Sequence, residues 1–151
     1  MEEIGTFEVI GITTRTTNEN GQSMADIEAL WGRFWGDKIQ DQIPNKLSDD
    51  IYAVYTNYES DYMGSYSLTI GARVRSLKEI PDGFTGLTVE GGAFRKYVSK
   101  GKMPDAVVKT WMEIWSDSDL KRAYTFDFTV HGEKYFDGDK AEVETFISIV
   151  E

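Results

Sequence analysis

Two pairs of tryptophans have the spacing that places aromatic rings together on one face of a helix. The chain has four tryptophans in 151 residues, and they occur as WGRFW at 31–35 and WMEIW at 111–115. Residues four apart lie one above the other on a helix, so each pair predicts an aromatic ridge. Such a ridge either fills a core or forms the wall of a ligand site, and the spacing leaves open which ring of each pair faces which way.

A carboxylate lies among aromatic residues in the run YTFDF at 124–128. If this run is a strand, alternation puts Asp127 and Thr129 on the face opposite the three aromatic residues. That face is either open to solvent, which is the commoner arrangement, or enclosed. Aromatic rings around an enclosed carboxylate would bind a lipophilic cation, because the ring faces attract the charge and the carboxylate neutralises it where water is excluded.

Other site chemistries have little support in the sequence. The chain has no cysteine and a single histidine, so neither a thiolate nor a multi-histidine metal site is predicted. No glycine-rich phosphate motif occurs, and no nucleotide cofactor is predicted. His131 has no G-x-S-x-G serine to activate, and it is expected at the surface or at the edge of a turn.

Composition and charge limit the partners. A formal net charge of -10 at pH 7 opposes direct binding to nucleic acid or to an anionic membrane, because the long-range field repels both. The amino terminus is acidic where a signal peptide would be basic, and no apolar run reaches the length of a membrane span. We therefore expect a cytoplasmic protein. The aromatic share of 13% is the unusual feature of its composition.

The hydrophobic pattern predicts an α+β protein with the order β-α-β-β, β-α-β-β. Apolar residues recur at three and four positions between 24 and 39, and again from Pro104 to Trp115, which predicts two amphipathic helices. Runs rich in β-branched and aromatic residues predict strands at 7–15, 51–58, 66–74, 84–98, 122–130 and 143–150. The strand at 84–98 is expected to bend or bulge at its two central glycines.

This order and the matched tryptophan pairs predict an internal repeat of about 1–76 and 84–151 within a single domain of residues 1–151. Neither half could close a large core alone, so the halves should pack about a pseudo-two-fold axis, each with an antiparallel sheet. Ligand sites often form where two such units meet, since that line is concave. The sequence therefore predicts a central ligand groove.

Several segments, in order, resemble the GyrI-like, or bacterial effector-binding, domain family. The resemblance covers most of the chain and is carried by YTNYESDYMGSYSLTIG at 55–71, IPDGF at 80–84 and VVKTWMEIWSDSDLKRAYTFDF at 107–128, with Tyr97 and Gly101 before the second helix. It implies a tandem β-α-β-β fold whose central groove takes aromatic or cationic small molecules. Members of that family occur alone or fused behind the DNA-binding part of AraC-type and MerR-type regulators.

One departure from the family pattern concerns charge. The family often continues the strand after the Asp-Phe pair with a glutamate and, two residues later, an aromatic residue. In this chain Thr129 stands at the position of the acid and His131 at that of the aromatic residue. The resemblance therefore implies a weaker preference for cations here than in relatives that carry the acid.

The leading hypothesis is a stand-alone, multidrug-binding-like protein that holds an aromatic or amphipathic small molecule, with cations among the candidates, and has no chemistry of its own. The predicted aromatic walls are Trp35, Tyr58, Tyr66, Trp111, Trp115 and Tyr124, and the predicted polar contacts are Asp127 and Thr129. One alternative is a hydrolase of reactive electrophiles with Asp127 as general base. The other is an acidic module that binds a protein partner, such as a transcription regulator or a topoisomerase.

Overall fold

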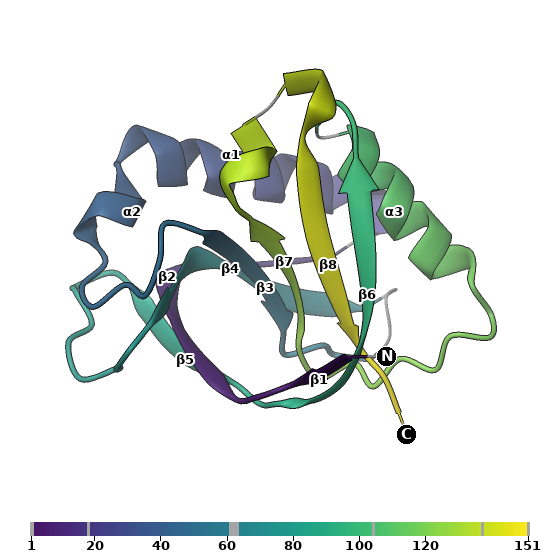
Figure 1. The fold of residues 1–151 in the computed structure, drawn as a ribbon, viewed down its shortest axis with the longest axis horizontal. Helices are drawn as coiled ribbons and strands as arrows, with labels where there is room; N and C mark the ends of the chain where they lie inside the picture. The colour runs from purple at the N-terminus through teal and green to yellow at the C-terminus, as the bar shows by residue number, and fades with distance from the viewer. Residues whose placement is uncertain (1, 18, 61–63, 104, 137, 151) are drawn as a thin grey trace.

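Eight strands form one antiparallel sheet in the computed structural model, which describes residues 2–17, 19–60, 64–103, 105–136 and 138–150. The order across the sheet is β1-β6-β8-β7-β3-β4-β2-β5 (Figure 1). The strands are β1 (Glu2–Ile4), β2 (Phe7–Thr17), β3 (Ile51–Thr56), β4 (Ser65–Val74), β5 (Thr85–Val89), β6 (Gly92–Lys100), β7 (Asp127–His131) and β8 (Glu142–Ser148). The predicted α+β class with antiparallel pairing is confirmed, although both halves build one continuous sheet.

The strand order has the symmetry that two β-α-β-β units would produce. β3 and β7 pair at the centre of the sheet, followed outward by β4 and β2 on one side and by β8 and β6 on the other. Each unit therefore places its second strand centrally and its first strand outermost, as a pseudo-two-fold axis between β3 and β7 requires. The duplication of sequence behind this order remains a prediction.

The two long helices are α1 (Gln22–Gly36) and α3 (Asp105–Ser116). The first ends before the predicted limit of 39, because the chain turns at Lys38, whose φ is 51°, and resumes as the short α2 (Ile39–Gln42). The predicted start of the second helix at Pro104 lies outside the described residues, as do residues 61–63 between β3 and β4. Short 3-10 turns complete the chain as η1 (Glu19–Gly21), η2 (Glu133–Phe136) and η3 (Gly138–Lys140).

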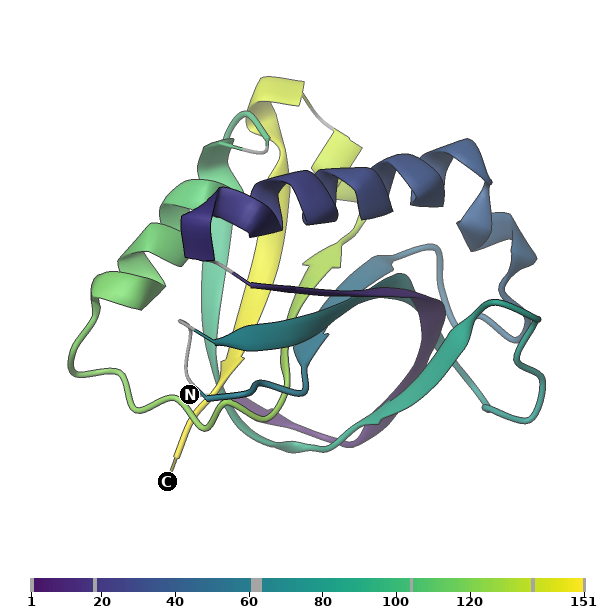
Figure 2. The ribbon, with the colours of Figure 1, turned by 180° about the vertical axis from the view of Figure 1, so that it is seen from behind.

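Both long helices cover the same face of the sheet (Figure 2). Cross-strand pairing aligns one row of residues on this face, in the order Ile12, Ile70, Ala53, Thr129, Thr145 and Tyr97. Leu30 and Phe34 of α1 pack at the Ile12 end of the row. At the other end, Thr110 of α3 is hydrogen-bonded to Ser99, two residues after Tyr97. The row therefore runs beneath both helices.

The opposite face is buried because the sheet curls into a half-barrel. Phe7 of β2 and Phe128 of β7 are separated by two strands in the sheet, yet their ring centroids lie 5.1 Å apart. Phe94 of β6 adds a third ring, 5.5 Å from that of Phe128. These contacts form a second hydrophobic core made by strand residues, and both long helices pack on the other face of the sheet.

The predicted strand at 84–98 is wrong as a single strand. β5 ends at Val89 and pairs with β2, whereas β6 begins at Gly92 and pairs with β8 on the other side of the sheet. The backbone at Gly91 packs closely against the amino-terminal segment. A Cβ at this position would lie 2.4 Å from the Ile4 carbonyl oxygen, so only glycine fits without a shift. The two glycines do mark a bend, but the strand partners on either side of it are set by distant segments.

The predicted strand at 122–130 begins only at Asp127. Tyr124 has a φ of 55°, which interrupts the extended backbone. The segment before it pairs instead with the end of β8, since the Ala123 N–H donates to the Ser148 carbonyl at 2.9 Å and the Val150 N–H donates to the Lys121 carbonyl at 2.8 Å. This pairing brings residue 122 close to the start of β7.

Within the part of the chain that the structure describes, every helix is too short or too polar to cross a membrane.

Candidate functional site

The row beneath the helices is apolar in one half of the sheet and polar in the other. Ile12, Ile70 and Ala53 line the half under α1, and Thr129, Thr145 and Tyr97 continue the same row under α3. All but Tyr97 are buried, and Tyr97 is half-buried. Buried polar side chains normally have hydrogen-bond partners. A ligand could supply such partners here, so we expect a site in the α3 half of this face.

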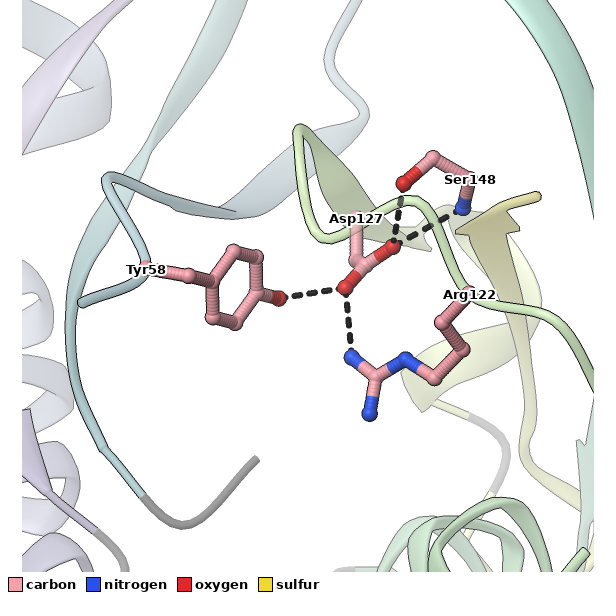
Figure 3. Close-up of polar contacts among 4 residues, drawn as sticks. All are labelled: Tyr58, Arg122, Asp127 and Ser148. Carbon is pink, nitrogen blue, oxygen red and sulfur yellow. Dashed lines mark hydrogen bonds and ion pairs between the residues drawn. The ribbon is translucent and has the colours of Figure 1, made fainter. Parts of the chain in front are cut away.

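Asp127, at the start of β7, is a charged residue in this half, and its side chain is fully buried. Its Oδ1 accepts hydrogen bonds from the Ser148 N–H at 2.8 Å and the Ser148 hydroxyl at 3.1 Å. Its Oδ2 accepts hydrogen bonds from the Tyr58 hydroxyl and from Nη2 of Arg122, the latter at 2.7 Å (Figure 3). Of the two arrangements considered for Asp127, the solvated outer face is therefore wrong and the enclosed one is observed, because Tyr58, Arg122 and Ser148 surround the buried carboxylate.

Arg122 is the residue that sequence reasoning missed. Its side chain is only 5% exposed, and it forms an ion pair with Asp127. On a continuous strand, residues 122 and 127 would point to opposite faces. The left-handed backbone of Tyr124 interrupts that alternation, so that both side chains meet on one face. Burial alone would lower the pKa of Arg122, but the charge and hydrogen bond of Asp127, together with Tyr58 and Tyr124, outweigh burial and raise the pKa.

Aromatic rings from both halves surround this ion pair. The Arg122 guanidinium carbon lies 4.4 Å from the ring centroid of Tyr124, 5.8 Å from that of Trp111 and 5.9 Å from that of Tyr58. These are cation–π distances. Tyr55 of β3 extends the cluster, with its ring 5.1 Å from that of Trp111. The cluster thus combines α3, the loop before β7 and the end of β3.

Five of the predicted aromatic residues belong to this one cluster. Tyr58 lies 6.0 Å from Tyr66 and 5.6 Å from Tyr124, and Trp111 lies 6.2 Å from Trp115, measured between ring centroids. Burial and the neighbouring Asp127 carboxylate raise the pKa of Tyr58 well above its usual value, so its hydroxyl stays protonated as a donor. The structure therefore brings Tyr58, Tyr66, Trp111, Trp115 and Tyr124 together with Asp127.

The two remaining predicted residues belong to a second cluster, which joins α1 to the end of β7. Trp35 stacks against Trp31 at 5.9 Å and contacts Phe136 of η2 at 6.2 Å between ring centroids. Thr129 is buried at the centre of the row, and its hydroxyl is 2.8 Å from Nε2 of His131. Trp31 links Trp35 to Thr129, because the Trp31 ring lies 5.0 Å from the ring of His131, the neighbour of Thr129. Trp35 is thus separated from the Asp127 cluster.

His131 is buried, which contradicts the expected surface or turn-edge position. It is 6% exposed and ends β7 beneath α1, with the Tyr135 ring 4.8 Å from its own. Burial lowers its pKa to about 4, so the ring is neutral at pH 7. The 3-10 turn η2 follows β7 and places Tyr135 against the His131 ring. The sequence pattern did not indicate that this turn would cover the end of the strand.

The orientation of the tryptophan pairs is the same in both helices. The first member of each pair faces the central strands, since Trp31 contacts His131 of β7 and Trp111 contacts Tyr55 of β3. The second member is more open, with Trp35 44% and Trp115 38% exposed. Each helix therefore directs one tryptophan toward the central strand of the other half of the sheet.

Several buried polar atoms on this face have no hydrogen-bond partner among the described residues. They are Nε and Nη1 of Arg122, Nε1 of Trp111, the hydroxyl of Tyr97, Oγ1 of Thr145 and Nδ1 of His131. Native proteins pair the large majority of such atoms, and an unpaired one calls for an explanation. Their concentration around the polar end of the row marks this region as the candidate site.

A comparison with family models identifies the chain. The model for integron-associated effector-binding proteins, named Cass2, matches residues 1–149. The chain belongs to the Cass2 effector-binding family. The resemblance found in the sequence was to the broader GyrI-like group. The family model matches nearly the whole chain and places it in an effector-binding family.

Other proteins match this Cass2 family member along most of their length, in structure or in sequence. An integron cassette protein from the mobile metagenome of Vibrio cholerae has 30% sequence identity and a TM-score of 0.74, with 99% of this chain and 94% of that chain covered. The structure of a protein named SAV2435 bound to tetraphenylphosphonium has 15% identity and a TM-score of 0.83, covering 99% and 92% of the two chains. A Bacillus subtilis (strain 168) protein, YobU, named as a transcriptional regulator, is 26% identical over 143 residues, which are 92% of this chain and 89% of YobU.

The geometry of Asp127 bears on the hydrolase alternative. A general base must accept a proton from a nearby water molecule. The two oxygens of Asp127 already accept four hydrogen bonds, from Tyr58, Arg122 and two groups of Ser148, which is about the number of lone-pair sites that a carboxylate offers. This arrangement suits a residue that positions its neighbours better than one that activates water.

Proposed function

We propose that this Cass2 family member binds an aromatic or amphipathic small molecule between α1 and α3, over the central strands β3 and β7. The observation that carries the proposal is the aromatic cluster around a buried ion pair, in which Trp111, Tyr58 and Tyr124 surround the Arg122–Asp127 pair. Burying a charged pair costs several kcal/mol per ion in desolvation, so its presence among these rings favours a binding role over simple filling of the core. The effector-binding family and the tetraphenylphosphonium complex of SAV2435 support the same class of function.

In this proposal the two tryptophans that face the central strands are the principal walls. Trp111 supplies a flat surface on the α3 side, Trp115 extends it toward solvent, and the buried Tyr66 packs beside Tyr58. Trp35 and Thr129 belong to the α1 side, where a longer ligand would extend past Trp31. The name of YobU leads us to propose that ligand binding serves transcription regulation, through a separate regulator as partner.

Isothermal titration calorimetry with 2-naphthamide, a neutral bicyclic aromatic probe, tests the proposal. We expect saturable binding, and we expect Trp111→Ala to weaken it roughly tenfold, because a stacked aromatic pair contributes about 0.5–1.5 kcal/mol beyond its buried area. Phe136→Ala is the matched control, since Phe136 is 63% exposed and belongs to the second cluster. The absence of saturable binding up to about 1 mM probe, a concentration that would reveal even millimolar sites, would refute the proposed function.

A further inference from the structure

A surface cleft of about 340 Å³ lies at the end of β4, and its lining residues belong to neither aromatic cluster. Arg73 and Arg75 place two positive charges in it. Leu47 lines the cleft with a side chain of a residue that is 50% exposed, and the buried Phe7 and Val74 add further apolar surface. Ligand sites in proteins have volumes of about 300–1,000 Å³, so the cleft has the size of a site for a small molecule.

Backbone pairing on both sides of β4 fixes the positions of the two arginines. Val74, which lies between them, pairs with Glu8 of β2 on one side. On the other side the Leu47 N–H donates to the Arg73 carbonyl at 3.0 Å, and a bond of 3.0 Å joins the Arg75 N–H to the same loop segment, 45–47. Residues two apart on an extended chain point to the same side, which is why both arginines line one cleft.

The Arg73 side chain is also held by aromatic rings. Its guanidinium carbon lies 5.0 Å from the ring centroid of Phe7, which is a cation–π distance. The Tyr52 ring lies 5.5 Å from that of Phe7. Burial raises the pKa of the Tyr52 phenol, and the neighbouring Arg73 opposes that rise. These contacts restrict the guanidinium before any ligand binds, which lowers the entropy cost of binding.

The charges of the cleft are not balanced within it. Neither Arg73 nor Arg75 has an ion-pair partner among the described residues, although the chain carries 26 acidic residues. Glu8 also lines the cleft, so its lining has two positive charges and one negative charge. The net charge of -10 opposes an anion at long range, but ions at about 0.15 M screen that field beyond about 8 Å. The cleft therefore favours a ligand with an anionic oxygen group.

We propose that this cleft binds a small organic anion, whose carboxylate or phosphate group is held by Arg73 and Arg75 and whose apolar part packs against Leu47. A guanidinium presents a fork of N–H donors that matches two oxygens of either acidic group. The site is separate from the aromatic site of the proposed function and does not depend on it.

Three aliphatic probes with the same four-carbon chain test the proposal, because they lack the rings that the aromatic cluster would bind. They are pentanoate, butyl phosphate and pentanamide, titrated into the isotope-labelled full chain near pH 7.5 and about 0.15 M salt, with binding followed by NMR amide shifts. We expect the anions to bind roughly three- to tenfold more tightly than the amide, between the effect of an exposed ion pair and that of a buried charged hydrogen bond. The shifts should centre on 45–47 and 73–75, and the tighter anion identifies the acidic group.

Four variants assign the anion preference to the cleft. Arg75→Gln and Arg73→Gln should each remove most of it, and both residues are exposed, so the variants should fold. Glu8→Gln should tighten anion binding, because it removes the negative charge of the cleft. Arg95→Gln is the matched control, since it removes one positive charge from an exposed position of β6 and should leave the preference unchanged.

The outcomes are separate from those for the proposed function. Equal binding of the anions and the amide, or shifts centred outside the cleft, would overturn the proposal. An anion preference that both cleft variants, Arg73→Gln and Arg75→Gln, leave intact would overturn it too, as would one that Arg95→Gln removes equally. Binding of 2-naphthamide is measured on its own and should be unchanged in Arg75→Gln, so either site can fail without the other.

Discussion

His131 makes a quantitative prediction about stability and pH. The neutral ring is buried against the rings of Trp31 and Tyr135, at 5.0 Å and 4.8 Å between centroids. Among the described residues, Nε2 has a hydrogen-bonding neighbour, the Thr129 hydroxyl, and Nδ1 has none. Burial lowers the pKa of His131 from 6.5 to about 4. Charging this ring in the folded protein is therefore costly, whereas the unfolded chain binds the proton readily.

The sign of the effect follows from this order of pKa values. Because the folded pKa is the lower one, the unfolded chain binds more protons between pH 6.5 and 4, and stability falls as the pH falls through that window. The contribution of the neutral ring is fully present above pH 6.5. At about 1.36 kcal/mol per pKa unit, a difference of 6.5 − 4 = 2.5 units corresponds to about 3 kcal/mol in total. About 2.5 kcal/mol of it should be lost between pH 7.5 and 4.5.

Urea unfolding at several pH values measures this contribution. The free energy of unfolding is compared between the unmodified protein and His131→Phe, which keeps a flat ring and removes the titrating group. Carboxylates titrate in both proteins, so their effects cancel in the difference. We expect the advantage of the unmodified protein over the variant to shrink by about 2.5 kcal/mol as the pH falls from 7.5 to 4.5. A difference that stays constant, or an NMR titration that gives His131 a pKa near 6.5, would refute the reasoning.

Two further predictions concern stability alone. Tyr58→Phe removes the hydrogen bond to the buried Asp127 carboxylate and should cost about 1.5–3 kcal/mol in urea unfolding; a loss below about 0.5 kcal/mol, the lower limit for an ordinary hydrogen bond, would mean that the bond does not form in solution. Gly71→Ala should destabilise the fold by about 3 kcal/mol or more, because its Cβ would lie 2.0 Å from the Ile10 carbonyl oxygen. Gly32→Ala, in the interior of α1 with nothing within 4 Å, is its control and should stabilise by about 0.5–1 kcal/mol; equal melting temperatures for the two glycine variants would contradict the close approach of β2 and β4.

Local periodicity was enough to predict the elements and much of the aromatic site. The spacing of three and four in α1 and α3 reports which face of a helix is buried, and this is why the tryptophan pairs were correctly assigned to helices. The same spacing places Trp111 and Trp115 together, and the rings of Tyr58 and Tyr124 join them in the structure. These features depend on residues close in sequence or on the strong tendency of large rings to be buried.

The charge balance of the site was decided by the tertiary structure. Asp127 could be recognised as a candidate, but its partner could not, because one left-handed residue at Tyr124 determines which face Arg122 occupies. The division of 84–98 between the two sides of the sheet was decided in the same way, by pairing with β2 and β8. Periodicity records which face of its own element a residue occupies, whereas the approach of two charged groups depends on turns and on strands paired across the whole chain. For this protein the sequence determined that aromatic rings would gather, and only the fold decided that a buried arginine would lie among them.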